Sequence, residues 1–578
     1  MTAARYLAIV GPTALLRVLK RRIGRLTCVV DKEHLLVWAA NDAPILGLGD
    51  QGVILGEMFD RGMKTPLAAI SDDDRQAIVA SGGKRLVERY WGGWIAMLGR
   101  ADGPITHIVR APLGDMPCIY RHQNGALMVA SDRDLLDTFE QSSVEIDWAE
   151  VTRHLAAPDV RRSPTCIKGI SELQGGDRLS WYPHGLVTDH LWSPWQFGSD
   201  PARPQDLCDA RSRVRDAINL AVAARSAAFS RVLLRLSGGL DSSIVAAALA
   251  KADRRFVALN MVTEDRAGDE REFARRVATS VGCTLVERFR SVATIDPTIS
   301  LAAGQSRPST RLFMQDSIVT ARAVAVEHGA DIVFDGGGGD NIFCYLPSVS
   351  PVIDRIRSDG IGWPVIQSAL DVSMLNQTPL GNVLRQVVRR MFRRSPRYRW
   401  RPNVHMLSVH AETAAATATD HPWLDCPDGA QPGKAGHIAL LVSAQSWVEA
   451  LDARAFPRSI SPLLAQPVVE ACLSIPSWHW IEGGVDRAIA REAFRPFLPR
   501  EIIERRGKGA PDSFLAQIVE THGSTIKEML MEGRLIRHGV INRKTVSAAL
   551  HNTRFLQNYD FLRLLQLVDA EAWAMTLD

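Results

Sequence analysis

The residues with the clearest chemical purpose lie at positions 236–243, in the string LSGGLDSS. Its two glycines let backbone N–H groups approach an anion without a side chain in the way. Its serines supply hydroxyl donors where a helix would begin, and the free amides and dipole of a helix N-terminus favour phosphate. Asp241 would repel phosphate oxygens unless a cation lay between them, and a carboxylate that holds Mg²⁺ resolves this repulsion. The string therefore predicts a phosphate-binding loop.

A second glycine-rich string stands at residues 335–340, which read DGGGGD. Four consecutive glycines cost conformational order, so we expect them only where the backbone must approach another group closely. Asp340 offers a second carboxylate. Because Mg²⁺ is commonly held by one or two carboxylates together with substrate phosphates, we expect Asp241 and Asp340 to share one magnesium ion.

Alternating strands and helices must position both strings. Expected strands lie at 232–236, 256–262, 284–289 and 331–336, and expected helices at 207–225, 242–251, 269–282 and 311–329. This alternation predicts a parallel sheet covered by helices on both faces, with ligands bound beyond the carboxyl ends of its strands. Both glycine strings follow a strand directly, so we expect them to meet at one edge of the sheet.

The rest of the chain differs in character. Residues 1 to about 200 have the pattern of short strands and turns, and a polar stretch with prolines at 192–206 marks a linker. A chain of 578 residues is too long for one core, so we expect two domains, 1–200 and 207–578. Residues from about 345 to 440 are less regular, and helical patterning returns after them.

Composition excludes several classes of protein. The eight cysteines include no CxxC pair, which argues against a zinc knuckle or a disulfide framework and favours core cysteines in a reducing compartment. The net charge of +4 argues neither for nor against nucleic acid, so any basic surface for a partner must be local. No apolar run reaches the ~20 residues that a membrane span needs. We therefore expect a cytoplasmic protein with neither a nucleic acid nor a membrane as partner.

The two strings resemble those of the asparagine synthetase family, and the likeness covers nearly the whole chain. LSGGLDSS matches the family's phosphate loop, and DGGGGDNIF is similar to its SGEGSDE-type segment. Residues 487–509 resemble its C-terminal stretch, and residues 108–132 and 166–181 resemble its glutaminase-type domain. The implied fold is α/β: an N-terminal glutaminase-like (Ntn-type) α+β sandwich, followed by an ATP-pyrophosphatase-type parallel α/β sheet domain.

The resemblance also implies a set of site residues. It assigns a catalytic lysine to Lys508, and it makes ATP and Mg²⁺ the cofactors, with Asp241 and Asp340 as metal ligands. The implied ATP contacts are Leu236, Ser237, Gly238, Gly239, Asp241, Ser242, Ser243, Met261 and Gly336.

Two departures from the family pattern bear on the substrate. Glutamine-dependent members need cysteine after the initiator Met, where this chain has Thr2, and their Asn-Gly element is replaced by the string YWGGW at 90–94. An inactive glutaminase domain kept as a scaffold accounts for both changes. Gly337 and Asn341 stand where asparagine synthetases have glutamates, which argues against aspartate as the substrate.

Without its own ammonia source, such an enzyme must receive the amine with its substrate. Residues 52–59, 89–98 and 461–494 most resemble the lasso-peptide cyclases of this superfamily. That resemblance implies a macrolactam formed between an Asp or Glu side chain and the N-terminal amine of a core peptide, with release of AMP and pyrophosphate. It also implies a leader-peptide-processing protease as partner. Asparagine synthase activity with ammonia or glutamine, β-lactam synthesis, and an inactive nucleotide-binding scaffold are the alternatives.

Two further features have open interpretations. Residues 385–401 hold eight arginines and no acidic residue, with Phe392, Tyr398 and Trp400 among them. The run is either a solvated helix face or a surface for a peptide or partner protein. Glu264, Asp269 and Glu270 could meet the substrate amine, and Asp269 is equally well placed to cap a helix.

Overall fold

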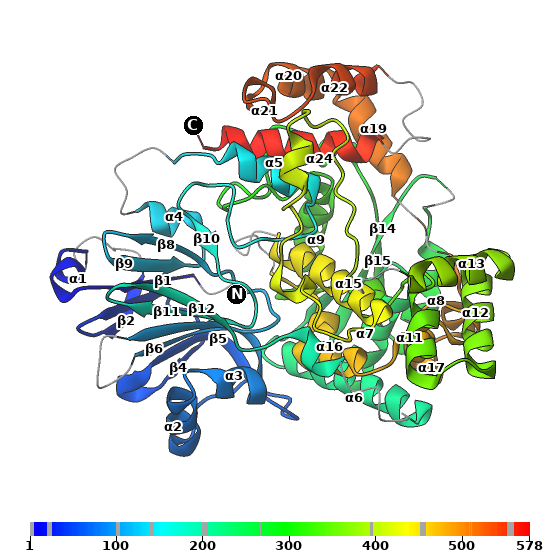
Figure 1. Ribbon diagram of the computed structural model, residues 1–578, viewed down its shortest axis with the longest axis horizontal. Coiled ribbons are helices and arrows are strands. Elements are labelled where there is room, and N and C mark those ends of the chain that lie inside the picture. The colour runs from blue at the N-terminus through cyan, green and yellow to red at the C-terminus, as the bar shows by residue number, and fades with distance from the viewer. Residues whose placement is uncertain are drawn as a thin grey trace.

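The computed structural model describes residues 5–19, 26–99, 105–138, 144–198, 206–265, 268–392, 397–450, 458–507, 509, 511–551 and 560–577. Among these residues the chain forms two antiparallel sheets and one parallel sheet, with helices around them (Figure 1). The α/β fold class expected from the sequence is confirmed.

The N-terminal part is a sandwich of two six-stranded antiparallel sheets. The first has the order β10 (Ser171–Glu172), β8 (Ile119–Gln123), β9 (Ala126–Ala130), β1 (Tyr6–Val10), β3 (Leu35–Ala39), β2 (Thr27–Asp31). The second has the order β12 (Gly185–His190), β11 (Asp177–Tyr182), β7 (Thr106–Arg110), β6 (Tyr90–Gly99), β5 (Gly52–Asp60), β4 (Ile45–Gly47). Alternate residues such as Ala8 and Leu55 pack in one core between the sheets, as the two-residue period of strands requires.

The helices of this part are short and lie outside the sandwich. They are α1 (Thr13–Leu19), α2 (Asp72–Ala80), α3 (Lys84–Arg89), α4 (Arg133–Asp137) and α5 (Trp148–Ala156). The expected pattern of strands with few long helices is therefore what the structure has.

The C-terminal part is built on a five-stranded parallel sheet. Its order is β15 (Thr284–Phe289), β14 (Phe256–Val262), β13 (Val232–Arg235), β16 (Ile332–Phe334), β17 (Ser459–Ile460). Leu233 on one face of β13 packs with Val324 of α9 (Met314–His328), while Leu234 on the other packs in the core that contains Ile244 of α7 (Leu240–Lys251). Both faces are thus covered, as the alternating pattern predicts.

The remaining helices surround this sheet. Those before residue 400 are α6 (Leu207–Ser226), α8 (Arg271–Val281), α10 (Gly339–Ile342), α11 (Ser350–Asp359), α12 (Trp363–Leu375) and α13 (Leu380–Met391). Those after it are α14 (Ala411–Ala415), α15 (Pro432–Glu449), α16 (Gln466–Leu473), α17 (Ala488–Phe494), α18 (Arg500–Ile503), α19 (Asp512–Thr521), α20 (Gly523–Glu532), α21 (Arg534–Arg537), α22 (Arg543–Leu550) and α24 (Asp560–Met575).

Residues 350–391, expected to be irregular, instead form the three helices α11, α12 and α13. The prolines and glycines that suggested turns lie at helix ends. Pro351 and Pro364 stand in the first turns of α11 and α12, where a missing N–H group costs no hydrogen bond. Gly360 and Gly362 lie between these two helices.

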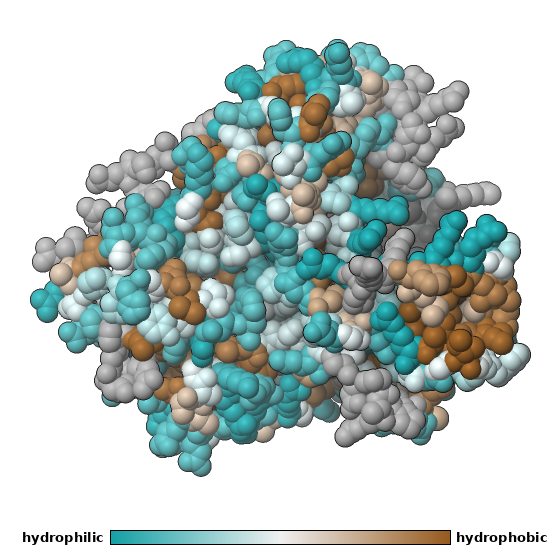
Figure 2. All heavy atoms as spheres, in the orientation of Figure 1, coloured by the Kyte–Doolittle hydropathy of each residue, from teal (hydrophilic) through white to brown (hydrophobic). Residues whose placement is uncertain are grey.

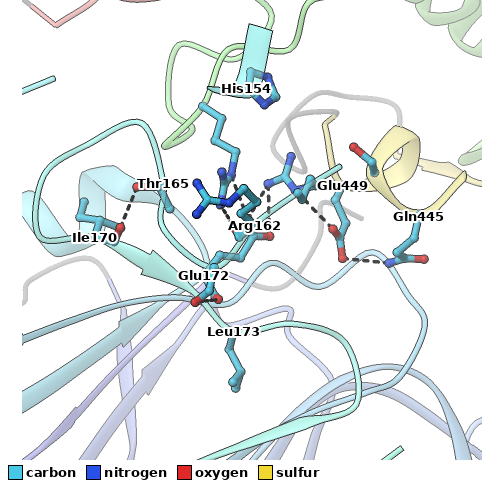
Figure 3. Close-up of polar contacts among 12 residues, drawn as sticks. His154, Arg162, Thr165, Ile170, Glu172, Leu173, Gln445 and Glu449 are labelled. Carbon is cyan, nitrogen blue, oxygen red and sulfur yellow. Dashed lines mark hydrogen bonds and ion pairs between the residues drawn. The ribbon is translucent and has the colours of Figure 1, made fainter. Parts of the chain in front are cut away.

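The two parts are joined by buried ion pairs. Figure 3 shows Glu449 of α15 directed toward a group of arginines. Arg110 of β7 donates to Glu449 at 2.5 Å, and Arg161 lies 3.3 Å from the same carboxylate. All three side chains are less than a tenth exposed. Because a buried charge is costly without its partner, these pairs fix the sandwich against α15.

None of the described helices is both long and apolar enough to cross a bilayer.

Candidate active site

The phosphate-loop string lies where the topology predicts it. It connects the end of β13 at Arg235 to the start of α7 at Leu240. Gly238 has φ of 73°, and a Cβ there would lie 2.7 Å from the backbone nitrogen of Ala274, so only glycine fits. The amides in the first turn of α7 have no acceptor within the helix and are available to an anion.

The serines of this loop divide into two kinds. Ser237 and Ser242 line the cavity beside the loop, and their hydroxyl oxygens lie 3.2 Å apart. Ser243 is fully buried, and its hydroxyl donates to the carbonyl of Gly239 at 2.7 Å. The Ser243 hydroxyl is thus engaged inside its own helix, whereas the hydroxyls of Ser237 and Ser242 lie beside each other at the cavity. Contact of these serines with ATP stays a prediction.

The second glycine string meets the first because β16 is the direct neighbour of β13 in the sheet. A Cβ on Gly336 would lie 2.5 Å from the backbone nitrogen of Ser242. A Cβ on Gly339 would lie 2.3 Å from Cγ of Asp241. The two loops are in contact at positions where any side chain would force them apart, which is the reason for consecutive glycines that the sequence suggested.

Asp241 and Asp340 converge on one cation, the guanidinium of Arg487. Its Nη1 lies 3.1 Å from Oδ2 of Asp241 and also contacts Oδ1 of Asp340. Arg487 precedes α17 with φ of 56°, a left-handed conformation that is uncommon for arginine. Asp486 holds the other side of the guanidinium at 2.5 Å.

The charges around Arg487 stabilise its protonated form. Burial acts against that form, but the carboxylates of Asp241, Asp340 and Asp486 outweigh it, so the pKa of Arg487 is raised above its ordinary value. The pair of carboxylates is thus organised around a positive charge, as a magnesium pair must be. The described residues contain no cluster of three or more His, Cys, Asp or Glu with metal-site geometry, so further oxygen ligands would have to come from a phosphate.

A cavity of about 430 Å³ opens beside these groups. Its lining includes the two glycine strings, Ser443, Ala444 and Trp447 of α15, and Met314 of α9. Arg505 also lines it and donates to the carbonyl of Gly238 at 3.2 Å. The cavity therefore combines charged groups with the apolar side chains of α15 and α9.

A second hollow of about 160 Å³ adjoins the first, sharing Arg235 and Ser237 with it. Met261, at the end of β14, lines this hollow together with Leu236 and Thr263. Its mixed polar and apolar lining suits a flat heterocycle. Met261 thus lines a hollow next to the phosphate loop, and its contact with ATP stays a prediction.

The expected catalytic Lys508 lies outside the described residues, as does Thr2. Of the described residues near it, Gly507 lines the larger cavity, and the N–H of Gly509 donates to Glu270 at 3.0 Å. Glu270 also pairs with Arg505 at 2.6 Å. Glu270 therefore holds Arg505 and Gly509 together. Asp269, one residue before the N-cap position of α8, accepts the N–H of Arg271 at 3.0 Å and so satisfies the first amide of that helix.

The departures from the asparagine synthetase pattern have structural consequences. Gly337 lines the larger cavity, so that wall has no carboxylate at this position. Asn341 donates to the carbonyl of Leu440 at 2.8 Å, tying α10 to α15. Asp335 accepts the N–H of Gly337 at 2.9 Å and the hydroxyl of Ser461 at 2.7 Å.

In the sandwich, the YWGGW string forms the start of β6. Trp91 and Trp94 are fully buried, and Trp91 stacks on Phe59 with ring centroids 4.6 Å apart. The string therefore packs the core of the domain and presents no amide side chain to a ligand.

Several residues of the site were not found by sequence reasoning. Arg487, Arg505 and Trp447 belong to segments far from the glycine strings, and only the fold brings them there. The resemblance of residues 487–509 to a catalytic segment could have indicated Arg487 and Arg505 as site residues. No feature of the sequence indicated Trp447.

A strand–loop–helix anion site faced by two carboxylates defines the nucleotide-binding class of parallel α/β domains that use a glycine-rich phosphate loop. Residues 213–575 match the family described as asparagine synthase. The chain therefore belongs to the asparagine synthase family, and its C-terminal part is an ATP-dependent amide ligase domain. No curated protein sequence matches the chain significantly.

Three solved structures share limited similarity with this chain. Glutamine phosphoribosylpyrophosphate amidotransferase from B. subtilis is 10% identical, with 59% of this chain and 71% of that chain covered and a TM-score of 0.18. The allosteric regulatory enzyme of purine biosynthesis is 10% identical, with coverages of 55% and 82% and a TM-score of 0.19. NAD⁺ synthetase from Burkholderia pseudomallei is 15% identical, with coverages of 43% and 90% and a TM-score of 0.18. Similarities of this size carry no weight for the fold or the function.

Proposed function

We propose that this enzyme uses ATP to activate a side-chain carboxylate of a short peptide as an acyl-adenylate, and then joins it to the N-terminal amine of the same peptide. The products are a macrolactam, AMP and pyrophosphate, as in lasso-peptide maturation. The observation that carries the proposal is the convergence of Asp241 and Asp340 on one cation beside an open phosphate loop.

The first support concerns the nucleotide. Two oxygen-ligand carboxylates around a positive charge fit Mg²⁺, which prefers such ligands completed by phosphate oxygens. Bound there, the ion would neutralise the charge of the leaving pyrophosphate. The loop amides, with the hydroxyls of Ser237 and Ser242, would hold the β- and γ-phosphates as a unit. Because these two phosphates then leave together as pyrophosphate, the substrate carboxylate attacks the α-phosphate.

The second support concerns the amine. The YWGGW string is core packing in β6, so the domain that would release ammonia from glutamine lacks the expected glutamine-binding element. If the substrate itself carries the amine, the enzyme needs no ammonia from glutamine. An intramolecular reaction also gains from proximity, because the fold then has only to hold the two ends of one peptide together.

The third support concerns the substrate pocket. The acidic residues among its described lining are Asp241, Asp335 and Asp340, and each is engaged with Arg487 or with loop groups. This leaves the α-ammonium group of a free amino acid without an evident carboxylate partner on those walls. The partly apolar wall of Trp447, Ala444 and Met314 suits peptide side chains.

Three further roles belong to this proposal. Lys508 stabilises the negative charge that develops as the acyl-adenylate forms and breaks. Arg487 and Arg505 supply positive charge to the departing pyrophosphate. A leader-peptide-processing protease provides the free N-terminal amine.

The experiment supplies purified protein with ATP, Mg²⁺ and a synthetic core peptide that has a free N-terminus and an internal Asp or Glu. A peptide lighter by one water, formed together with AMP and pyrophosphate, is expected. The matched control is the same peptide with an acetylated N-terminus, which should not cyclise. Asparagine formed from aspartate, ATP and ammonia, with no change in any peptide, would contradict the proposal.

A further inference from the structure

The helical hairpin of α12 and α13 exposes large apolar side chains that no part of the described chain covers. On α12, Trp363, Ile366, Leu370 and Met374 are between 38% and 69% exposed. On α13, Leu384, Val388 and Met391 are between 46% and 53% exposed. Figure 2 shows a continuous hydrophobic area at the right-hand end of the molecule, where Figure 1 places these helices. We call these seven residues the hairpin patch.

The hairpin patch is separate from the side of the hairpin that holds it to the protein. Val365, Ala369 and Val372 of α12 are buried and pack with Val383 and Val387 of α13 in one core. The exposed apolar residues of α12 recur at spacings of three and four, so they form a second stripe on the same helix. A helix that is apolar on two faces is expected inside a larger apolar environment, not in water.

The ends of the hairpin extend the patch. Ile361, before α12, is 90% exposed, and Phe392, after α13, is 84% exposed. Soluble monomers rarely expose a continuous apolar area of this kind unless it binds something. Because these side chains project from the end of the molecule, whatever binds the patch must have a surface into which a projecting hairpin can insert.

The charges beside the patch have one sign. Arg385 and Arg389 are exposed on α13, one position after Leu384 and Val388, so they form a stripe next to the apolar one. Between residues 361 and 401 the sequence has eight arginines and one acidic residue, Asp371. Asp371 is 4% exposed and accepts the backbone N–H groups of Gly483 and Gly484, so it does not offset the arginines at the surface.

Nearby acidic groups on the packed elements are few. Asp359, which ends α11, pairs with Arg355 at 3.2 Å. Glu482, in the 3-10 helix Ser477–Gly484 under α12, lies 3.9 Å from His479. The surface beside the patch is therefore basic along α13, and each of these acidic neighbours lies beside a basic side chain.

We infer that the hairpin patch docks on an anionic lipid surface. Apolar side chains on two adjacent helices would enter the boundary between headgroups and acyl chains, while the arginines of the neighbouring stripe reach the lipid phosphates. A second copy of this chain would present the same arginine-flanked patch, so it supplies no matching negative charge along α13. A protein partner would need carboxylates against the α13 edge, whereas anionic headgroups supply that charge at every orientation. The inference revises the expectation that no membrane is involved, and it is independent of the reaction proposed above.

The test is flotation of the purified full-length protein with two kinds of vesicle. One is pure phosphatidylcholine, and the other contains about one third phosphatidylglycerol, at ionic strengths of about 0.1 M and 1 M. We expect flotation with the anionic vesicles at low salt and much less in the other conditions. The double variant Ile366→Glu/Leu370→Glu should lose about tenfold or more of this partitioning, because both side chains leave water on binding.

Two controls separate the alternatives. Val326→Glu, which changes an exposed apolar residue of α9 outside the patch, should float like the wild type. Arg385→Gln/Arg389→Gln should float less with anionic vesicles and be unchanged with neutral ones. All variants alter exposed side chains, and unchanged thermal unfolding confirms that they fold.

Absence of flotation with anionic vesicles, or equal flotation of the double glutamate variant, would overturn the inference. So would a dimer in light scattering that the glutamate variant dissociates, since that result assigns the patch to a second copy. Saturable binding of an acidic amphipathic peptide at the patch, without flotation, would assign it to a protein partner and also overturn the inference.

Discussion

Gly339 lies so close to Asp241 that a methyl group on its Cα would stand 2.3 Å from the carboxylate carbon. The two residues are far apart in sequence and come from loops that follow neighbouring parallel strands. The glycine therefore sets how near the two carboxylate-bearing loops can approach, and with it the geometry of the proposed metal pair.

Gly339→Ala should displace Asp241 and reduce ATP-dependent pyrophosphate release by about 100-fold, the cost of a misplacement of about 1 Å in a catalytic site. The measurement is a coupled pyrophosphate assay with a reactive peptide. Gly523→Ala, at a helix start where nothing lies within 4 Å of an added Cβ, is the matched control and should keep full activity. Equal rates for the two variants would contradict the steric argument.

Arg487 and a divalent cation compete for the same two carboxylates. Replacing Arg487 with Gln should let Mg²⁺ stabilise the nucleotide-free protein at about tenfold lower concentration, because the competing charge is gone. Thermal unfolding at increasing Mg²⁺ measures this shift. Arg495→Gln, which removes a surface pair with Glu492, is the control. The same Mg²⁺ dependence in wild type and Arg487→Gln would show that the cation does not bind between these carboxylates.

His437 should make the protein sensitive to acid. Burial lowers the pKa of His437 to about 3, and its Nε2 lies 2.7 Å from the carbonyl of Ile342 at the end of α10. Below an unfolded-state pKa of about 6.5, the unfolded chain takes up a proton that the folded chain does not. This group therefore lowers the free energy of unfolding by about 1.4 kcal/mol for each pH unit of acidification between about 6.5 and 3.

His437→Gln keeps a donor for that carbonyl and does not titrate. Urea unfolding between about pH 4 and 5.5, where the unfolded imidazole is almost fully protonated, should show a pH slope smaller by about one proton than in the wild type. Parallel slopes for the two proteins would mean that His437 titrates normally in the folded state.

Glu449 neutralises buried arginines between the two parts of the protein. Glu449→Gln should lower the free energy of unfolding by about 2–3 kcal/mol, because Arg110 and Arg161 lose one of the two buried carboxylates that they share and keep only Glu172. Glu412→Gln, at an exposed position of α14, should have little effect. Chemical unfolding followed by tryptophan fluorescence gives both values. A change below about 1 kcal/mol for Glu449→Gln would show that water reaches these arginines.

The sequence was informative where local pattern and function coincide. The strands at 256–262 and 284–289 have the expected bounds, and both glycine strings lie at the expected edge of the sheet. These features follow from the hydrophobic periodicity, the residue composition, and the order of strands and helices along the chain. The helices at 350–391 were missed because Pro351 and Pro364 indicate turns in a sequence and yet are compatible with the first turn of a helix.

Other parts of the site depend on tertiary contacts that no local pattern encodes. Trp447 reaches the cavity from a helix that otherwise has the composition of an apolar core element. The bridging position of Arg487 results from its left-handed backbone and from Asp486 beside it. Ser243 has the residue type of a phosphate ligand. It lies one residue after Ser242 on α7, and its hydroxyl donates to the carbonyl of Gly239 within the helix.

The central claim is that the carboxylates of Asp241 and Asp340 direct chemistry to the α-phosphate of ATP. It is tested most directly with a core peptide whose reacting carboxylate carries ¹⁸O, followed by mass spectrometry of the nucleotide products. The account predicts ¹⁸O in AMP, with cyclisation lost in Asp241→Asn. Label recovered in inorganic phosphate together with ADP would contradict it.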